Sequence, residues 1–180
     1  MPLPLSLLLP SEAATAALAA QLAPRLAPGD TLLLSGPVGA GKSAFARALI
    51  RARLGDPWAE VPSPTFTLVQ TYGDGPDTLW HADLYRLSHP DEVAELGLLA
   101  AMEEAICLIE WPDRLGPLAP ATALHLDLLP EGEESRRLTL SGPEAWDARL
   151  RNGGKLRERR KPRRCGHRNT AYQEIGRAHV

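Results

Sequence analysis

The segment at residues 32–50, LLLSGPVGAGKSAFARALI, constrains the fold of this chain more than any other stretch. It joins an apolar run, a glycine-rich turn and a stretch with apolar residues at helical spacing, and it contains the complete pattern G-x-x-x-x-G-K-[ST]. In this context the pattern predicts a loop whose backbone N–H groups bind phosphate, because glycines permit a close approach and the following helix points its positive dipole end at the same anion. A turn that merely connected a strand to a helix would not require the Lys-Ser pair.

The residues of this loop have separate predicted tasks. Lys42 is expected to reach the β- and γ-phosphates of a nucleotide and to act in catalysis, and the Ser43 hydroxyl is expected to bind Mg²⁺. The whole phosphate cradle is predicted to comprise Gly36, Pro37, Val38, Gly39, Ala40, Gly41, Lys42 and Ser43. No guanine-selecting N-K-x-D stretch occurs in the sequence, which favours ATP over GTP as the nucleotide.

The rest of the chain alternates between strand and helix patterns. Apolar or β-rich runs predict strands at 3–9, from 31, and at 66–72, 78–87, 105–111, 124–129 and 137–140. Helical patterns run from Ser11 to Pro28-Gly29 and over 44–53, 91–102 and 143–149. Short connections predict antiparallel hairpins between 66–72 and 78–87 and between 124–129 and 137–140. We therefore predict an α/β protein with a P-loop NTPase-like three-layer fold, in which helices flank a central mixed sheet with antiparallel hairpins.

Two carboxylates at strand positions complete the predicted site. Glu110 follows the apolar run ICLI, which is the placement expected of a Walker-B-like acid that binds the metal beside the nucleotide. Asp83 lies in the strand predicted at 78–87, where its carboxylate is able to orient an attacking water. Phosphoryl transfer requires held phosphates, a metal and an oriented water, and these residues would supply all three.

Three further residues keep two interpretations each. Thr65 either responds to the γ-phosphate as a switch threonine or caps a strand. Trp111 either packs near the nucleotide or a partner, or is half-buried core at a strand end. His81 either relays a proton or, as the favoured alternative, is a structural hydrogen-bond partner beside Asp83. Thr65 and Trp111 are retained as candidate nucleotide-binding residues.

Composition and charge limit the classes of protein. The 180 residues, 44% of them hydrophobic, suit one α/β domain. The net charge of −2 conceals a basic segment at 152–180, with nine Lys or Arg against two Asp or Glu, which leaves −9 on residues 1–151. An acidic segment at 1–151 offers no broad basic face for direct nucleic-acid binding. Cys107 and Cys165 form neither a zinc nor a disulfide pattern, and the proline-containing N-terminus lacks a signal or membrane segment, so a reducing cytoplasm is expected.

Five motifs occur in a fixed order over most of residues 1–143: GPVGAGKS, VPSPTFTLVQTY, HADLYRL, the Glu-Leu-Gly at 95–97 and ICLIEWPDRLG. Together they resemble the TsaE family, also called YjeE, of small bacterial ATPases in the threonylcarbamoyladenosine modification of tRNA. The resemblance implies ATP and Mg²⁺ as cofactors, Ser43 and Glu110 as metal ligands, and Asp83 as a residue needed for hydrolysis. It also implies the partner proteins TsaB and TsaD, with TsaD performing the transfer on tRNA, so that this chain would meet tRNA only through the complex.

Other functions remain open at this point. A P-loop small-molecule kinase would need an acceptor pocket and lid arginines, but the nearby arginines are Arg47, Arg51 and Arg53 on the loop helix and Arg86, which is expected on a strand facing away from Asp83. A nucleotide-gated interaction module, in which hydrolysis only resets the loop at Thr65, overlaps with the family role. The scarcity of cations predicts slow hydrolysis alone and acceleration by partners.

The segment at 152–180 is predicted to lie outside the ATPase domain at 1–151, because it is basic and lacks apolar periodicity. One interpretation is a disordered basic arm that touches tRNA phosphates. The other, which we favour, is a read-through artefact, since the final IGRAHV is the in-frame translation of a common sequencing-library adapter, ATC GGA AGA GCA CAC GTC.

Overall fold

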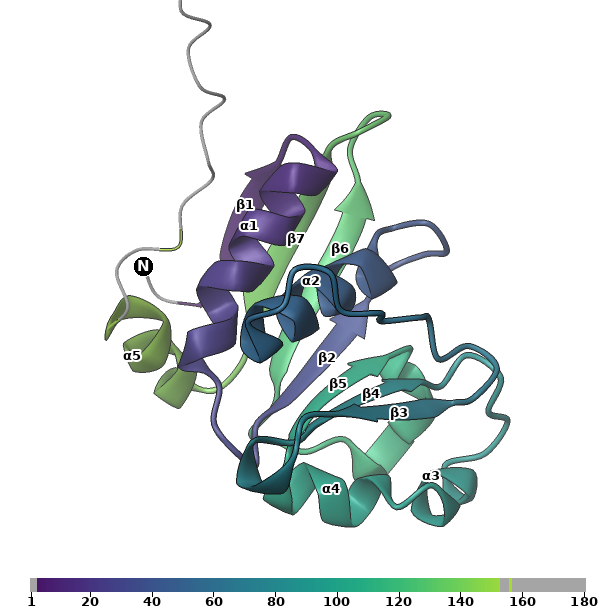
Figure 1. Ribbon diagram of the computed structural model, residues 1–180. Coiled ribbons are helices and arrows are strands. Elements are labelled where there is room, and N and C mark those ends of the chain that lie inside the picture. Colours follow the sequence, from purple (N-terminus) through teal and green to yellow (C-terminus); the bar gives the residue numbers. More distant parts are fainter. Residues whose placement is uncertain (1–2, 153–155, 157–180) are drawn as a thin grey trace, which may run out of the picture.

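The fold is built on one seven-stranded sheet with the order β1-β7-β6-β2-β5-β4-β3 (Figure 1). The computed structural model describes residues 3–152 and residue 156. The strands are β1 (Leu5–Leu9), β2 (Thr31–Ser35), β3 (Val69–Tyr72), β4 (Leu79–Asp83), β5 (Ile106–Glu110), β6 (Leu124–Pro130) and β7 (Arg136–Ser141). The neighbours β6, β2, β5 and β4 pair in parallel, and antiparallel pairs join β3 to β4, β7 to β6 and β1 to β7. The predicted mixed sheet and both hairpins are confirmed.

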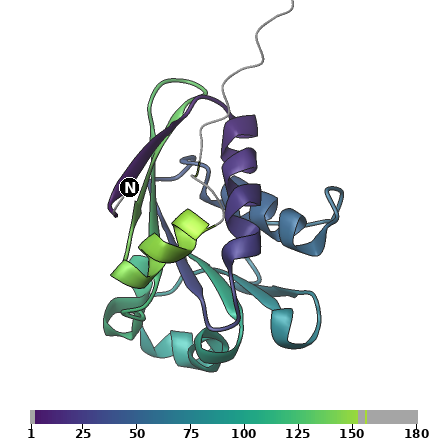
Figure 2. The same cartoon turned by 90° about the vertical axis from the view of Figure 1, so that its left-hand side faces the viewer.

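Helices cover both faces of this sheet, as the two views in Figures 1 and 2 show. The larger core cluster packs α1 (Glu12–Leu22), α2 (Lys42–Leu54) and α5 (Glu144–Asn152) with one face. The smaller cluster packs α3 (Asp91–Glu95), α4 (Leu98–Glu104) and the 3₁₀ segment η3 (Pro112–Leu118) with the other. The three-layer α/β prediction is confirmed.

The central strand β2 explains why both faces carry helices. Side chains alternate between the faces of a sheet, and here Leu32 and Leu34 belong to the larger cluster while Leu33 belongs to the smaller one. All three side chains are buried, which is typical of a parallel strand covered on both sides. The continuous apolar run before the glycine loop therefore fixes β2 in the middle of the sheet.

The first helix begins where the sequence predicts and ends earlier. The Ser11 hydroxyl accepts a hydrogen bond from the backbone N–H of Ala14 at 3.2 Å, which caps α1. The helix ends at Leu22 and continues as the 3₁₀ segment η1 (Ala23–Arg25), so the prediction of one helix up to Pro28 was wrong. Pro24 lacks the N–H that an α-helical turn requires at that position, and the chain tightens there instead.

Other predicted elements are divided or shorter in the structure. The helix predicted at 91–102 is divided into α3 and α4, because Gly97 adopts the left-handed region with φ 74°. The strand predicted at 66–72 begins only at Val69, since Leu68 also has a positive φ. The strand predicted at 78–87 ends at Asp83, so the expectation that Arg86 lies on a strand was wrong.

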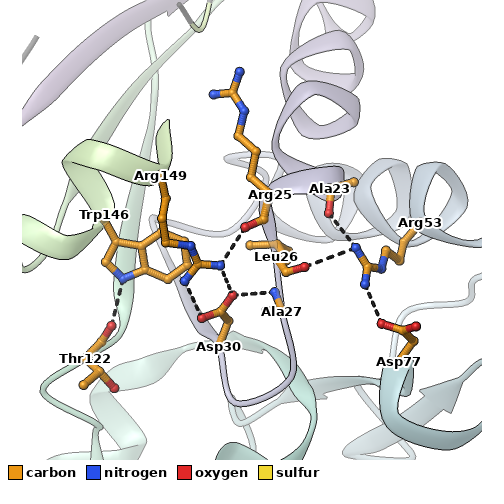
Figure 3. Close-up of polar contacts among 10 residues, drawn as sticks. All are labelled: Ala23, Arg25, Leu26, Ala27, Asp30, Arg53, Asp77, Thr122, Trp146 and Arg149. Carbon is orange, nitrogen blue, oxygen red and sulfur yellow. Dashed lines mark hydrogen bonds and ion pairs between the residues drawn. The ribbon is translucent and has the colours of Figure 1, made fainter. Parts of the chain in front are cut away.

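The closing helix α5 is attached through side chains that reach distant turns (Figure 3). Arg149 donates from Nη1 to Asp30 Oδ1 at 2.7 Å, and its Nη2 donates both to Asp30 Oδ2 and to the carbonyl oxygen of Arg25. The Trp146 indole N–H donates to the carbonyl oxygen of Thr122 at 2.8 Å, and the Arg149 guanidinium lies 4.3 Å from the Trp146 ring centroid. The turn before β2 is thereby fixed to the end of the domain.

The described residues extend past the predicted end of the domain, and they include one of the two cysteines. Leu156 packs partly against the larger core cluster, five residues beyond the predicted boundary at 151, and the tail at 157–180 with Cys165 lies outside the described residues. Cys107 is buried and free, and burial raises the pKa of its thiol to about 12. Within the described residues, no helix has both the length and the apolar character needed to cross a membrane.

Replacing the buried anchor of α5 should destabilise the fold. Trp146 is 2% exposed, so Trp146→Ala is expected to lower the free energy of unfolding by about 3–5 kcal/mol, measured by urea denaturation. Trp58→Ala is the matched control, because Trp58 is 87% exposed and its truncation should change stability by no more than about 0.5 kcal/mol. Equal losses in the two variants would contradict the assigned packing of α5.

Candidate functional site

A cleft of about 440 Å³ opens where the parallel strands β2, β4 and β5 end. Ligands of parallel α/β sheets bind at this edge, because loops and helix N-termini converge there. The lining residues are Val38, Gly39, Gly41, Lys42, Ser43, Ala44, Thr65, Asp83, Tyr85, Glu110 and Trp111. The predicted loop, the two carboxylates, Thr65 and Trp111 thus lie around one cleft. Gly36, Pro37 and Ala40 belong to the same loop but are not among the residues that line the cleft.

The loop turns at glycines for two different reasons. Gly36 has φ 137°, and a Cβ added there would lie 2.2 Å from the carbonyl oxygen of Leu128 on β6, so the position excludes any side chain. Gly41 has φ 101° at the N-cap of α2, which directs the first turn of the helix toward the cleft. No heavy atom lies within 4 Å of a Cβ added at Gly41, so there the limit is the backbone conformation alone.

Lys42 is folded over its own loop. Its Nζ donates to the carbonyl oxygens of Gly36 at 2.7 Å and Pro37 at 2.9 Å, and it lies 4.2 Å from the Trp111 ring centroid. Burial lowers the pKa of Lys42, whereas the charges of Glu110 and Asp83 act in the opposite direction. The ammonium group is therefore held beside the cleft by weak neutral ligands that an anionic phosphate is able to replace.

Glu110 connects the loop to the sheet. The Ser43 hydroxyl donates to Glu110 Oε2 at 2.9 Å, and Glu110 Oε1 lies 2.8 Å from His81 Nε2. Both His81 and Glu110 are 1% exposed, and among the described residues His81 Nδ1 has no hydrogen-bond partner. A neutral His81 that donates from Nε2 leaves only a lone pair unsatisfied at Nδ1, which costs less than a buried N–H without an acceptor. His81 is thus a structural partner, as favoured, but its partner is Glu110 and not Asp83.

Two donors hold the Asp83 carboxylate in the cleft, on the strand next to that of Glu110. The Thr65 hydroxyl donates to Asp83 Oδ2 at 3.0 Å, and the backbone N–H of Tyr85 donates to Asp83 Oδ1 at 3.0 Å. Because β3 begins at Val69, Thr65 caps no strand, and that interpretation was wrong. Its side chain joins the loop at residues 61–68 to the carboxylate expected to act on water.

The half-buried core interpretation of Trp111 agrees with the structure, and its contact with a nucleotide stays a prediction. Trp111 lines the cleft and also packs, partly buried, against the smaller core cluster. Its backbone adopts φ 57° and ψ 54°, a left-handed conformation that is uncommon for a large side chain and occurs most often at functional sites. The Tyr85 ring lies 4.9 Å from the Trp111 ring, centroid to centroid, so the ring that Lys42 contacts packs against a second aromatic ring.

Two residues at the site escaped sequence reasoning. Tyr85 lines the cleft and lies in the motif HADLYRL, two residues after Asp83. That short separation is a local signal from which its place at the site could have been predicted. Arg136 donates to the carbonyl oxygens of Ala40 and Gly39, although it lies 96 residues from Ala40 in sequence. No local pattern marks a contact of that separation.

The side chains present fit a nucleotide-bound Mg²⁺ better than a metal held by protein alone. Among the described residues, no group of three or more His, Cys, Asp or Glu side chains is placed to hold a metal ion. Mg²⁺ usually takes one or two protein oxygens together with phosphates and waters. Ser43 Oγ and Glu110 Oε2, which are hydrogen-bonded to each other, are two protein oxygens of the type that Mg²⁺ takes, and they lie at the end of the phosphate loop.

A G-x-x-x-x-G-K-[ST] loop between a central parallel strand and a helix defines the class of P-loop proteins with an α/β fold. Within that class, the chain belongs to the TsaE family. The family's sequence model, described as "Threonylcarbamoyl adenosine biosynthesis protein TsaE", matches residues 9–138.

Individual relatives agree with this membership. The chain is similar to the "tRNA threonylcarbamoyladenosine biosynthesis protein TsaE" of Rickettsia felis, with 40% identity over 73% of this chain and 76% of the relative. The protein of the same name from Bacillus subtilis is 36% identical over 63% of this chain and 70% of the relative. The crystal structure of Bacillus subtilis YdiB is similar with a TM-score of 0.67 and 25% identity, covering 85% of this chain and 95% of that one.

Substitution at the tight approach of the loop to β6 should be costly. Gly36→Ala combines an unfavourable φ with a 2.2 Å contact to backbone, so it is expected to lower the free energy of unfolding by clearly more than the roughly 1–2 kcal/mol that a left-handed alanine costs. Gly55→Ala is the control, since Gly55 has φ 66° but no atom within 4 Å of an added Cβ. Thermal and urea unfolding measure both, and equal losses would show that the contact to Leu128 is not limiting.

Proposed function

We propose that this protein binds ATP and Mg²⁺ in the cleft and hydrolyses ATP slowly, as a component of the machinery that makes threonylcarbamoyladenosine in tRNA. The pathway is taken from the family and from the names of the relatives. The observation that carries the chemistry is the single cleft that brings Lys42, Ser43, Asp83 and Glu110 together from three separate segments of the chain.

The residues have distinct roles in this proposal. The backbone of residues 36–43 would cradle the phosphates, and Lys42 would exchange its loop carbonyls for the β- and γ-phosphate oxygens. Ser43 and Glu110 would hold Mg²⁺, which offsets charge that develops on the phosphates, and His81 keeps the Glu110 carboxylate in place.

Asp83 would act on the attacking water. Both of its oxygens already accept hydrogen bonds, which fixes the carboxylate at the rim of the phosphate loop. A carboxylate has further acceptor positions, so it is able to orient a water while it keeps Thr65 and the Tyr85 N–H. Trp111 and Tyr85 would cover the phosphate end of the ligand and limit access of bulk water.

The partners in this proposal are TsaB and TsaD, with TsaD performing the transfer and tRNA met only through the complex, in the cytoplasm. Among the described residues, no arginine lines the cleft. Arg47 and Arg51 donate to the carbonyl oxygens of Val61 and Ala59, and Arg53 pairs with Asp77. The Arg86 guanidinium lies 5.6 Å from the Phe66 ring centroid. A cation for the transition state would therefore come from a partner.

A nucleotide-gated interaction module is a second candidate, and the Thr65–Asp83 hydrogen bond favours it. Phe66 follows Thr65 directly and is 84% exposed. A change at Asp83 that moves Thr65 would therefore also move an exposed apolar side chain, which a partner protein is able to bind. This candidate shares the site and differs only in the use of hydrolysis. The alternative of a small-molecule kinase would need arginines at the cleft, and none of the described residues that line it is an arginine.

Removing the charge of Asp83 should separate binding from hydrolysis. Asp83→Asn is expected to keep ATP affinity within about twofold and to reduce phosphate release at least about 100-fold, because the amide keeps the shape but loses the charge that orients water. Asp77→Asn, at an exposed ion pair with Arg53, should leave both quantities unchanged. Undiminished turnover in Asp83→Asn would make Asp83 a purely structural residue.

The proposed function itself is tested by steady-state phosphate release with and without partners. The protein alone is expected to turn over below the roughly 1–100 s⁻¹ of dedicated kinases, and addition of TsaB and TsaD should accelerate it, since an arginine supplied in trans contributes about 10³–10⁵ in rate. Asp83→Asn with the same partners is the matched control. Fast turnover that ignores the partners but responds to an added metabolite would favour the kinase.

A further inference from the structure

Arg136 is the first residue of β7. Its guanidinium contacts main-chain carbonyls of the phosphate-binding loop. Its Nε donates to the carbonyl oxygen of Ala40 at 3.0 Å, and its Nη2 donates to that of Gly39 at 3.4 Å. Its Nη1 donates to the carbonyl oxygens of Ser135 at 2.9 Å and Glu133 at 3.3 Å. One rigid, planar group thus ties the loop to the turn between β6 and β7.

The bond to Ala40 bears directly on the ligand side of the loop. The carbonyl of Ala40 and the N–H of Gly41 belong to one planar peptide and point in opposite directions. Fixing the carbonyl outward on Arg136 therefore turns the Gly41 N–H the other way, and Gly41 lines the cleft. Because Gly41 has no Cβ, its backbone has wide conformational freedom, and this contact restricts it.

The charge of Arg136 also contributes to the electrostatic potential at the loop. Among the described residues, no acidic side chain forms an ion pair with it, although Glu12 and Glu134 line the same cavity of about 140 Å³. Its four acceptors are neutral main-chain carbonyls. A cation with neutral partners beside a phosphate cradle raises the local potential, and the effect is greatest where side chains are partly shielded from water.

We propose that Arg136 is a positioning residue, which holds the phosphate-binding loop in the conformation that binds a nucleoside triphosphate. The proposal rests on the proposed ATP binding, but it assigns a role to a residue outside every motif that carried that function. Arg136 acts through the peptide between Ala40 and Gly41 and touches no reacting atom.

Titration calorimetry with ATP and Mg²⁺ tests this on the full chain. Arg136→Ala is expected to weaken ATP binding by about 10- to 100-fold, which is the range that loss of an outer positioning contact causes at metal sites. Arg136→Lys should recover part of that loss, because an ammonium group keeps the charge and is able to donate to some of the carbonyls, but its three donors lack the planar fork that reaches four. Arg137→Ala is the control, since Arg137 follows in the same strand and pairs with Glu131 of the same turn.

A second readout follows the loop without nucleotide. Amide hydrogen exchange in the peptide that spans 36–46 should be faster in Arg136→Ala than in Arg137→Ala, while the two variants have similar melting temperatures. Binding by Arg136→Ala within twofold of the parent, or an equal loss in Arg137→Ala, would overturn the proposal. If the parent fails to bind ATP and loop exchange still depends on Arg136, the proposed function falls and the positioning role stands.

Discussion

The parallel pairing of β2 with β5 and of β5 with β4 is the constraint on which the site depends. In this register Leu34 lies opposite Glu110, and Glu110 lies opposite Asp83. Paired residues of neighbouring strands project from the same face of a sheet, so the two carboxylates stand side by side on the face that carries α2. The glycine loop starts at the same edge, which brings the Ser43 hydroxyl within hydrogen-bond distance of Glu110.

Hydrogen bonds to buried polar groups give this edge its fixed geometry. Lys42, His81, Asp83 and Glu110 are all buried, and each has at least one hydrogen-bond partner within the fold. A buried polar group that loses its partner costs about 1–3 kcal/mol, so the side chains keep their positions in the absence of a ligand. In the proposed function, nucleotide binding would change the hydrogen bonds of Lys42 to its loop carbonyls and of Thr65 to Asp83. The adjacent Phe66 and the paired rings of Tyr85 and Trp111 would transmit such a change to the surface.

Much of the fold and the site could be predicted because local chemistry determines it. The loop from Gly36 to Ser43, the Ser11 cap and the apolar strands follow from residue type and spacing, and the strand-end placement of Glu110 follows from the run before it. Element ends were predicted less well. A left-handed Gly97 divided one predicted helix and a positive φ at Leu68 shortened a strand, since these backbone choices depend on packing against neighbouring elements.

The sequence by itself determined that this chain carries a phosphate-binding loop in a parallel α/β sheet, because contiguous residues supply the glycines, the cation and the helix dipole. It also determined the family, because five motifs occur in order. Only the tertiary structure decided that His81 forms a hydrogen bond with Glu110, that Thr65 donates one to Asp83, and that Arg136 donates to a main-chain carbonyl of the loop. Those contacts join segments 18 to 96 residues apart, and their partners are chosen by strand register and by the path of the backbone, which no local pattern encodes.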